Sequence, residues 1–68
     1  MNDEAFQTSI RKLLKTVGVT TQQEIEKAVQ LGLSEGYLKG DERLPARITV
    51  EVDGLSLALD FDGDIILE

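Results

Sequence analysis

The chain has 68 residues, of which 41% are hydrophobic and 29% are charged, and its net charge at pH 7 is −6. A chain of this length folds as one small domain that buries only about 60% of the surface exposed by its unfolded form. Because it contains neither histidine nor cysteine, it can form no disulfide, no imidazole or thiolate metal site and no Ser-His or Cys-His nucleophile. We therefore expect a single domain, residues 1–68, that is not an enzyme and holds no cofactor or metal.

The distribution of charge bears on partners and location. Residues 41–68 carry all of the net negative charge, and the chain starts with an acidic segment where a secretory signal would be basic. Nucleic acids and anionic membranes are bound mainly through lysine and arginine, and no apolar run approaches the roughly 20 residues that span a bilayer. We expect a cytoplasmic protein with no membrane partner, and the charge argues against nucleic acid as a partner.

A first helix is predicted from the start of the chain to Val17. Its apolar residues recur at intervals of three and four, which places them on one helical stripe. These residues are Phe6, Ile10, Leu13, Leu14 and Val17. Asn2 or Asp3 can cap the N-terminus, and Gly18 stands where a left-handed residue commonly ends a helix. We therefore expect this helix to end at Gly18.

A second helix is predicted after a link of two or three residues. A capping box can form from Thr21 with Glu24 or from Thr20 with Gln23. The apolar stripe of this helix consists of Ile25, Ala28, Val29 and Leu33. Leu31 falls off that stripe, and Gly36 is the expected left-handed residue at the C-terminal end.

Alternating apolar and polar residues predict strands after a loop that ends at Pro45. The strand over residues 46–52 and the next strand are separated by Asp53-Gly54, a typical two-residue hairpin turn. Such a turn pairs Ile48 with Leu59 and Val50 with Leu57. All apolar residues of the hairpin then share one face.

A second turn is predicted at residues 61–63, before a third strand over residues 64–68. A two-residue loop would leave Ile65 and Leu67 on the polar face, whereas a three-residue loop with Gly63 in the bulge position returns them to the apolar face. We therefore predict an α+β fold of order ααβββ, in which a helical hairpin packs on one face of a three-stranded antiparallel meander.

The acidic run at residues 60–64 resembles part of a calcium-binding loop. An EF-hand needs a glycine at the sixth loop position, a glutamate at the twelfth and flanking helices. Here Gly63 is the fourth residue and strands are predicted on both sides. An acidic hairpin turn is the better interpretation.

The helix pair around Gly18 also invites comparison with a helix-turn-helix. Its would-be recognition helix contains one basic residue, Lys27, whereas this motif brings several to the DNA backbone. A local basic patch exists in the first helix, at Arg11, Lys12 and Lys15, although the helix dipole accounts for bases near a C-terminus. A nucleic-acid-associated accessory protein that uses this patch is therefore the alternative hypothesis.

The preferred hypothesis is a protein-interaction or regulatory module. Exposed apolar positions and an open sheet edge are the features that support it. The residues that we predict to contact a partner are Leu31, Ile48, Val50 and Ile66. The strand at 46–52 is the better edge for an added strand, because the strand at 64–68 is short and acidic. The partner is either another protein or a second copy in a homodimer.

The order of segments also resembles a known family. The segments are Val17-Gly18-Val19-Thr20, then residues 23–29, then Leu44-Pro45-Ala46-Arg47 leading into a Val/Leu-rich meander with Asp62-Gly63. In this order they resemble a family of short stand-alone bacterial proteins classed only as a domain of unknown function. The resemblance covers nearly the whole chain. It implies a bacterial cytoplasmic protein and carries no activity and no site residues.

Overall fold

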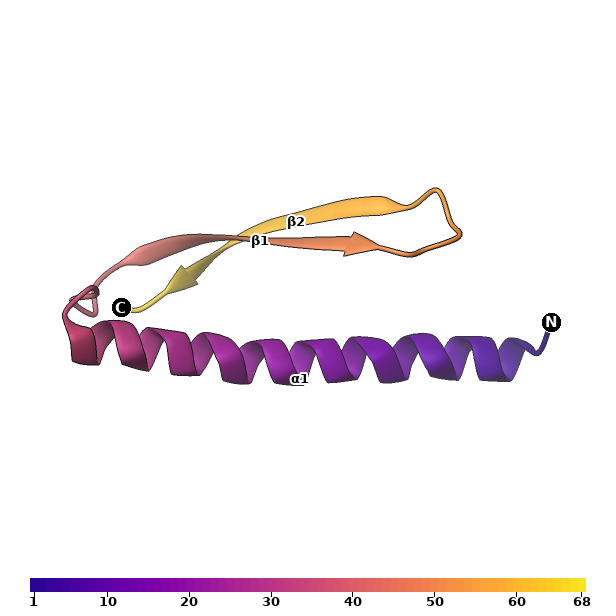
Figure 1. The fold of residues 1–68 in the computed structure, drawn as a ribbon, viewed down its shortest axis with the longest axis horizontal. Coiled ribbons are helices and arrows are strands. Elements are labelled where there is room, and N and C mark those ends of the chain that lie inside the picture. Colours follow the sequence, from indigo (N-terminus) through magenta and orange to yellow (C-terminus); the bar gives the residue numbers. More distant parts are fainter. The chain divides into compact units, whose positions relative to one another are not determined.

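A computed structural model describes all residues, 1–68. It contains one helix, α1 (Asp3–Glu35), and two strands, β1 (Arg43–Glu51) and β2 (Ala58–Ile66), as Figure 1 shows. The chain divides into two structural units, Met1–Tyr37 and Leu38–Glu68. The first unit contains α1 and the second contains the β-hairpin. The prediction of two helices and three strands is therefore wrong, although the combination of helix and antiparallel sheet is right.

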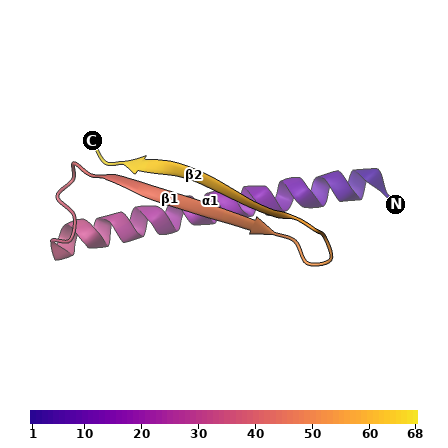
Figure 2. The ribbon, with the colours of Figure 1, turned by 90° about the horizontal axis from the view of Figure 1, so that it is seen from above.

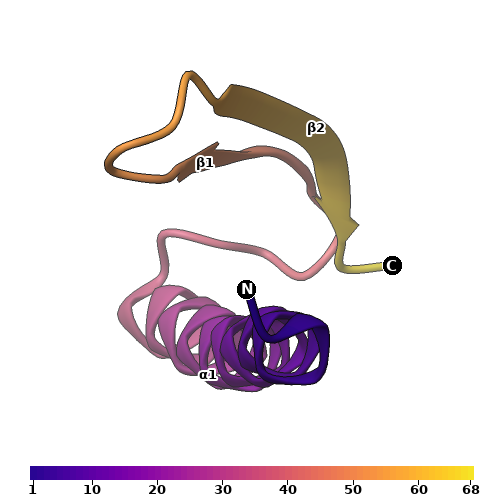
Figure 3. The ribbon, with the colours of Figure 1, turned by 90° about the vertical axis from the view of Figure 1, so that its right-hand side faces the viewer.

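The helix does not end at Gly18. In Figure 3, α1 is seen nearly end-on as one continuous coil, and Gly18 is not among the glycines with positive φ. A glycine inside a helix costs about 1 kcal/mol, whereas a proline would break it, and α1 contains no proline. Thr21 stands four residues after Val17 and four before Ile25, so the two predicted stripes join along one helix.

Continuity of α1 places Leu31 relative to the first half of the helix as well. Leu31 follows Leu13 by 18 residues, which is about five turns at 3.6 residues per turn. The two leucines therefore lie on the same side of α1, at the edge of the joined stripe. Ile25 and Val29 are half-buried, whereas Leu31 is 60% exposed, and its spacing from the stripe of Ile25, Ala28, Val29 and Leu33 is the same in a continuous helix as in a separate one.

The two ends of α1 follow the sequence signals. The Asn2 side-chain oxygen accepts a hydrogen bond from the Ala5 N–H at 3.0 Å, which satisfies a free donor of the first turn. At the other end, Gly36 has φ 83°, and the N–H of Tyr37 donates to the carbonyl of Gly32 at 2.8 Å. This is a Schellman ending. The predicted helix end at Gly36 is confirmed, and of the two predicted caps, Asn2 or Asp3, the cap is Asn2.

The hairpin has one register throughout its length. β1 pairs antiparallel with β2 from Arg43↔Ile66 to Glu51↔Ala58, and Figure 2 shows the two strands side by side, joined at one end by a loop. Side chains alternate between faces along each strand. One face is apolar and consists of Leu44, Ala46, Ile48, Val50, Leu59, Phe61 and Ile65. The other face is polar and carries the charged residues of both strands.

No turn forms at Asp62-Gly63. Both residues lie inside β2, where Asp62 pairs with Arg47 and Gly63 pairs with Ala46. Asp60, Asp62 and Asp64 recur at every second position, so one long strand keeps all three on the polar face, with Gly63 on the apolar face. The predicted third strand at 64–68 is therefore wrong, and its first residues are the end of β2.

Asp53-Gly54 does form a turn, but not the predicted two-residue hairpin. The N–H of Leu55 donates to the carbonyl of Val52 at 3.2 Å, and positive φ occurs at Gly54 only. Type I′ turns, whose twist matches a hairpin, need positive φ at both central residues. The connecting loop therefore extends over residues 52–57. As a result Val50 pairs with Leu59 and Ile48 with Phe61, two residues away from the predicted register but on the predicted face.

Candidate protein-interaction surface

Neither structural unit has a hydrophobic core. No apolar side chain of the chain is buried, and a single helix or a two-stranded hairpin cannot enclose one by itself. Leu13 and Leu31 of α1 are 62% and 60% exposed, and Ile48 and Phe61 of the hairpin are 49% and 57% exposed. Contiguous apolar surface of this kind marks contact sites on proteins. The apolar stripe of α1 and the apolar face of the hairpin are therefore candidate contact surfaces.

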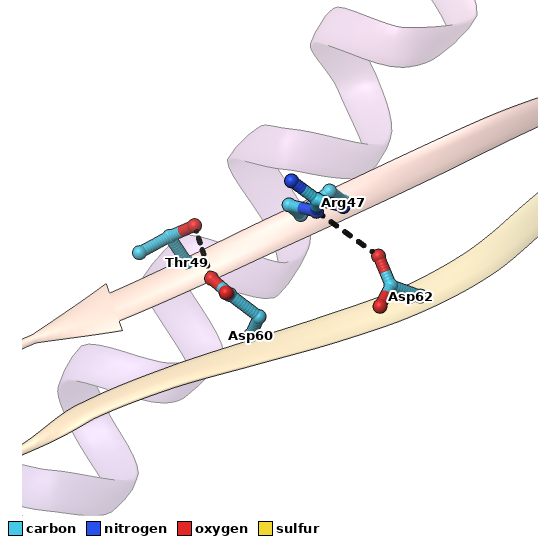
Figure 4. A network of polar contacts seen from close by, with 4 residues as sticks. All are labelled: Arg47, Thr49, Asp60 and Asp62. Carbon is cyan, nitrogen blue, oxygen red and sulfur yellow. Dashed lines mark hydrogen bonds and ion pairs between the residues drawn. The ribbon is translucent and has the colours of Figure 1, made fainter.

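The polar face of the hairpin is organised by three cross-strand pairs, two of which are drawn in Figure 4. The Arg47 Nε donates to the Asp62 Oδ1 at 3.1 Å, and the Thr49 hydroxyl donates to the Asp60 Oδ1 at 2.7 Å. Arg43 makes a third contact, to the Asp64 carboxylate at 3.2 Å. The aspartates that resembled part of a calcium loop are thus each hydrogen-bonded to a side chain of β1, and no group of acidic residues in the chain is arranged to hold a metal ion.

These pairs orient the hairpin more than they stabilise it. The side chains of Arg47 and Asp62 are each 69% exposed, and exposed ion pairs typically contribute about 0 to 1 kcal/mol. The presence of these polar pairs on one face nevertheless fixes which face of the hairpin remains apolar. A shift of the strand register by one residue would move every side chain of that strand to the opposite face. These partners were not predicted from the sequence. The signal was present as Arg43, Arg47 and Thr49 on one face of β1 and as aspartates at every second position from 60 to 64 of β2.

Backbone hydrogen bonds show which groups of β1 point away from β2. The N–H of Leu67 donates to the carbonyl of Glu42 at 2.9 Å, one position beyond the pair Arg43↔Ile66. In an antiparallel ladder, residue pairs that exchange hydrogen bonds alternate with pairs whose N–H and C=O groups point outward. Even-numbered residues of β1 therefore bond to β2. Odd-numbered residues direct their backbone groups to the free edge.

Pro45 provides an independent check of this assignment. Proline has no N–H to give to a ladder and is tolerated in a strand where that position faces away from the neighbour. Pro45 lies inside β1, not before it as predicted, and its odd number places it on the outward side. The free edge of β1 thus lacks one donor at Pro45 and keeps its full set of donors at Arg47, Thr49 and Glu51.

The two free edges of the hairpin differ in charge. On β2 the outward positions include Asp60, Asp62 and Asp64, and repeated like charges are one way in which proteins protect an edge strand. On β1 the outward positions beyond Pro45 carry a cation, a hydroxyl and an anion, in that order. Only the β1 edge has mixed charges next to free backbone groups.

Segment 39–42, just before β1, is held by a carboxylate. The Glu42 Oε2 accepts from the Lys39 N–H at 2.8 Å, and its Oε1 accepts from the Gly40 N–H at 2.9 Å. The hydrogen bond from Lys39, followed by the one from Gly40, lowers the pKa of the Glu42 carboxyl below its ordinary value. An ionised Glu42 therefore fixes the backbone of Lys39 and Gly40 just before β1.

The structure brings together only some of the residues predicted to contact a partner. Ile48 and Val50 share the apolar face of β1, and Ile66 lies on the opposite face across from Arg43. Leu31 belongs to the other structural unit. Within the hairpin, Ile66 therefore does not share a face with Ile48 and Val50, and the β1 edge with Ile48 and Val50 is the part that combines apolar surface with free hydrogen-bonding groups.

The predicted basic patch lies within α1. No ion pair involves Arg11, Lys12 or Lys15. The one ion pair of α1 joins Lys27 to Glu24 at 3.5 Å. The hollow along α1 is open and lined by polar residues of one helix, Gln23, Glu26, Lys27 and Gln30. Nothing in it resembles an enclosed ligand site. A nucleic-acid role for the basic patch stays a prediction.

Together, the fold and the open edge define a small α+β protein whose apolar residues are presented on surfaces. The whole chain, residues 1–68, matches the family of unknown function DUF6494, and the chain belongs to that family. The resemblance to a family without assigned function is thus confirmed. No curated protein and no solved structure matches the chain. The helix α1 is not apolar enough over a sufficient length to cross a membrane.

Proposed function

We propose that this protein is a non-catalytic interaction module that binds another protein chain through its exposed apolar surfaces. The observation that carries the proposal is the absence of any buried apolar side chain in a sequence that is 41% hydrophobic. Hydrophobic burial is the dominant favourable term in folding. Neither structural unit obtains that term by itself, and in this proposal a further protein surface supplies it.

The secondary structure supports the same proposal. Helical stability in proteins comes mostly from packing of an apolar face and not from intrinsic propensity, and a two-stranded hairpin alone is marginally stable in water. The apolar stripe of α1 and the apolar face of the hairpin both need a covering surface. A non-catalytic role is supported by the lack of histidine and cysteine and by the positions of the strand aspartates, which pair with Arg43, Arg47 and Thr49.

The test is the dependence of folding on association. Thermal unfolding of the purified chain is followed by far-ultraviolet circular dichroism over a thousandfold range of concentration, with sedimentation velocity on the same samples. If binding supplies the missing burial, the midpoint rises with concentration for a self-associating chain, or melting is broad and non-cooperative for a chain that needs a different partner. A monomer with a sharp, concentration-independent transition would contradict the proposal, because such a chain completes its own core.

A further inference from the structure

We propose that two copies of this chain pair through the free edges of β1, antiparallel and centred on Thr49, to form a four-stranded sheet of order β2-β1-β1-β2. The inference rests on the proposed interaction function and names its partner as a second copy. It is carried by three features of β1: the direction of its free backbone groups, the position of Pro45 and the order of its charges.

The backbone restricts how two β1 edges can meet. Only odd-numbered residues direct N–H and C=O groups outward, so an odd residue of one copy must face an odd residue of the other. Registers that include Pro45 lose a hydrogen bond, because proline has no N–H. The longest pairing of β1 with itself that leaves Pro45 outside covers residues 47–51 of each copy. In that register Thr49 faces Thr49 of the second copy at the two-fold axis.

The same register pairs opposite charges. Arg47 of each copy lies directly opposite Glu51 of the other, and this contact occurs twice because the pairing is symmetric. Cross-strand pairs of opposite charge stabilise a sheet, whereas like charges destabilise it. Glu51 takes part in no hydrogen bond or ion pair within the chain, whereas Arg47 uses its Nε for Asp62 at 3.1 Å. The remaining guanidinium N–H groups of Arg47 stay available for a second carboxylate.

The apolar face continues across the proposed junction. With Thr49 at the axis, Ile48 of one copy is opposite Val50 of the other, and the reverse pair follows by symmetry. Both residues are on the face that holds Leu59 and Phe61. A hairpin of two strands becomes a sheet of four, and three or more strands with an apolar face are what independent stability requires.

The β2 edge is excluded from the same role by its charges. Antiparallel pairing of two β2 edges over the outward positions would bring Asp60, Asp62 and Asp64 of one copy against the same residues of the other. Two-fold pairing at β1 therefore leaves the acidic edges at the outside of the four-stranded sheet, where they discourage further addition of strands.

Proline substitution tests the edge directly. Thr49→Pro removes an outward N–H without removing a ladder donor, and Asp60→Pro does the same on the β2 edge. Both changes abolish the Thr49–Asp60 hydrogen bond, so they are matched in their effect within the hairpin. We expect Thr49→Pro to raise the dimer dissociation constant by at least about tenfold through loss of its two symmetric hydrogen bonds. Asp60→Pro should leave the dimer dissociation constant within about twofold of the value for the natural chain.

Charge reversal provides a second test that does not disturb the backbone. Glu51→Arg places two arginines opposite each other at both ends of the junction, and Glu68→Arg makes the same charge change outside the strands. Sedimentation velocity should show a weaker dimer for Glu51→Arg than for Glu68→Arg at low salt, with a smaller difference at high salt. Equal weakening by both variants would contradict the assigned edge.

A disulfide reports the register. The natural chain has no cysteine, so a Thr49→Cys variant contains one thiol per copy. Hydrogen-bonded antiparallel pairs have Cα atoms about 5.5 Å apart, within the range of a disulfide. Oxidation should link Thr49→Cys into a covalent dimer. Glu51→Cys should stay largely unlinked, because the two copies of residue 51 are offset by more than about 13 Å along the strands.

The outcomes separate this inference from the proposed function. A dimer that tolerates Thr49→Pro and forms no disulfide at position 49 overturns the β1 junction and leaves the interaction module standing. A monomer at millimolar concentration that melts non-cooperatively also overturns the junction and points to a different protein partner. A monomer with a sharp, concentration-independent transition overturns both.

Discussion

The helix and the hairpin of this protein satisfy their backbone hydrogen bonds in different ways. Inside α1 every turn bonds to the next, and its ends are completed by Asn2 and Gly36. The hairpin bonds only along its inner side, so each strand keeps a row of unused donors and acceptors. A helix can therefore offer a partner only side chains, whereas a strand edge offers backbone as well. This difference is why the proposed self-association is placed on β1 and not on α1.

The largest effect is expected from breaking the continuity of α1. Gly18→Pro removes a hydrogen bond in the middle of the helix and introduces a steric clash, at a cost of about 3 kcal/mol or more. Circular dichroism should show a large loss of helical signal. Asp3→Pro is the matched control, because proline is well accepted at the first helical position. Equal helicity in the two variants would contradict a continuous α1.

Two glycines of the helical unit should respond to alanine with opposite sign. Gly36 has φ 83°, where a side chain costs about 1 to 2 kcal/mol, so Gly36→Ala should lower the thermal midpoint. Gly18 has helical geometry and no atom within 4 Å of an added Cβ. Gly18→Ala should therefore raise stability by about 1 kcal/mol. Urea unfolding followed by circular dichroism measures both, and a stabilising Gly36→Ala would contradict the left-handed ending.

A smaller effect is expected at the polar face of the hairpin. Asp62→Asn removes the charge that pairs with Arg47, and the exposed position limits the loss to about 0 to 1 kcal/mol. The loss should shrink as salt is added, because ions screen exposed charges. The measurement is the free energy of unfolding of Asp62→Asn and of the natural chain, at low and at high salt. A salt-independent loss would mean that the carboxylate acts by some other contact.

The smallest effect is a local one at Glu42 and depends on pH. Its pKa is lowered in the folded chain by the hydrogen bonds from Lys39 and Gly40. A group with a lowered pKa stabilises the fold above its unfolded pKa, and the contribution is lost as pH falls through the folded pKa. The amide resonances of Lys39 and Gly40 should therefore titrate below the ordinary range of a glutamate. In Glu42→Gln this titration should disappear, and its persistence would show that another group is responsible.

Local signals in the sequence were sufficient for several parts of the structure. A cap at Asn2 or Asp3 and a helix end at Gly36 were predicted and are confirmed, and Asp53-Gly54 does lie in a turn, although not in the two-residue hairpin that was predicted. Each depends on a few neighbouring residues whose backbone preferences hold in any context. The division of the hairpin into an apolar and a polar face was also predictable, because alternation along a strand survives a register shift of two residues.

The errors arose where a local signal competed with a longer pattern. Gly18 and Asp62-Gly63 are typical of a helix end and a turn, yet both lie inside regular elements. At Gly18 the modest cost of one glycine is offset by an unbroken series of helical hydrogen bonds. At Asp62-Gly63 the strand continues, and Asp62 and Asp64 accept hydrogen bonds from Arg47 and Arg43 of the neighbouring strand.

The sequence by itself determined the composition of the surfaces: a chain without histidine or cysteine, a helical apolar stripe, and two segments of alternating residues. It also determined the family to which the chain belongs. Only the tertiary structure decided that α1 is continuous, that β2 is one strand, and that Arg47, Thr49 and Glu51 point their backbone groups to a free edge. The features of the hairpin depend on pairing between residues distant in the chain, whose energy cannot be read from local preference alone. The continuity of α1 depends on helical hydrogen bonds that extend through Gly18 and outweigh its local preference.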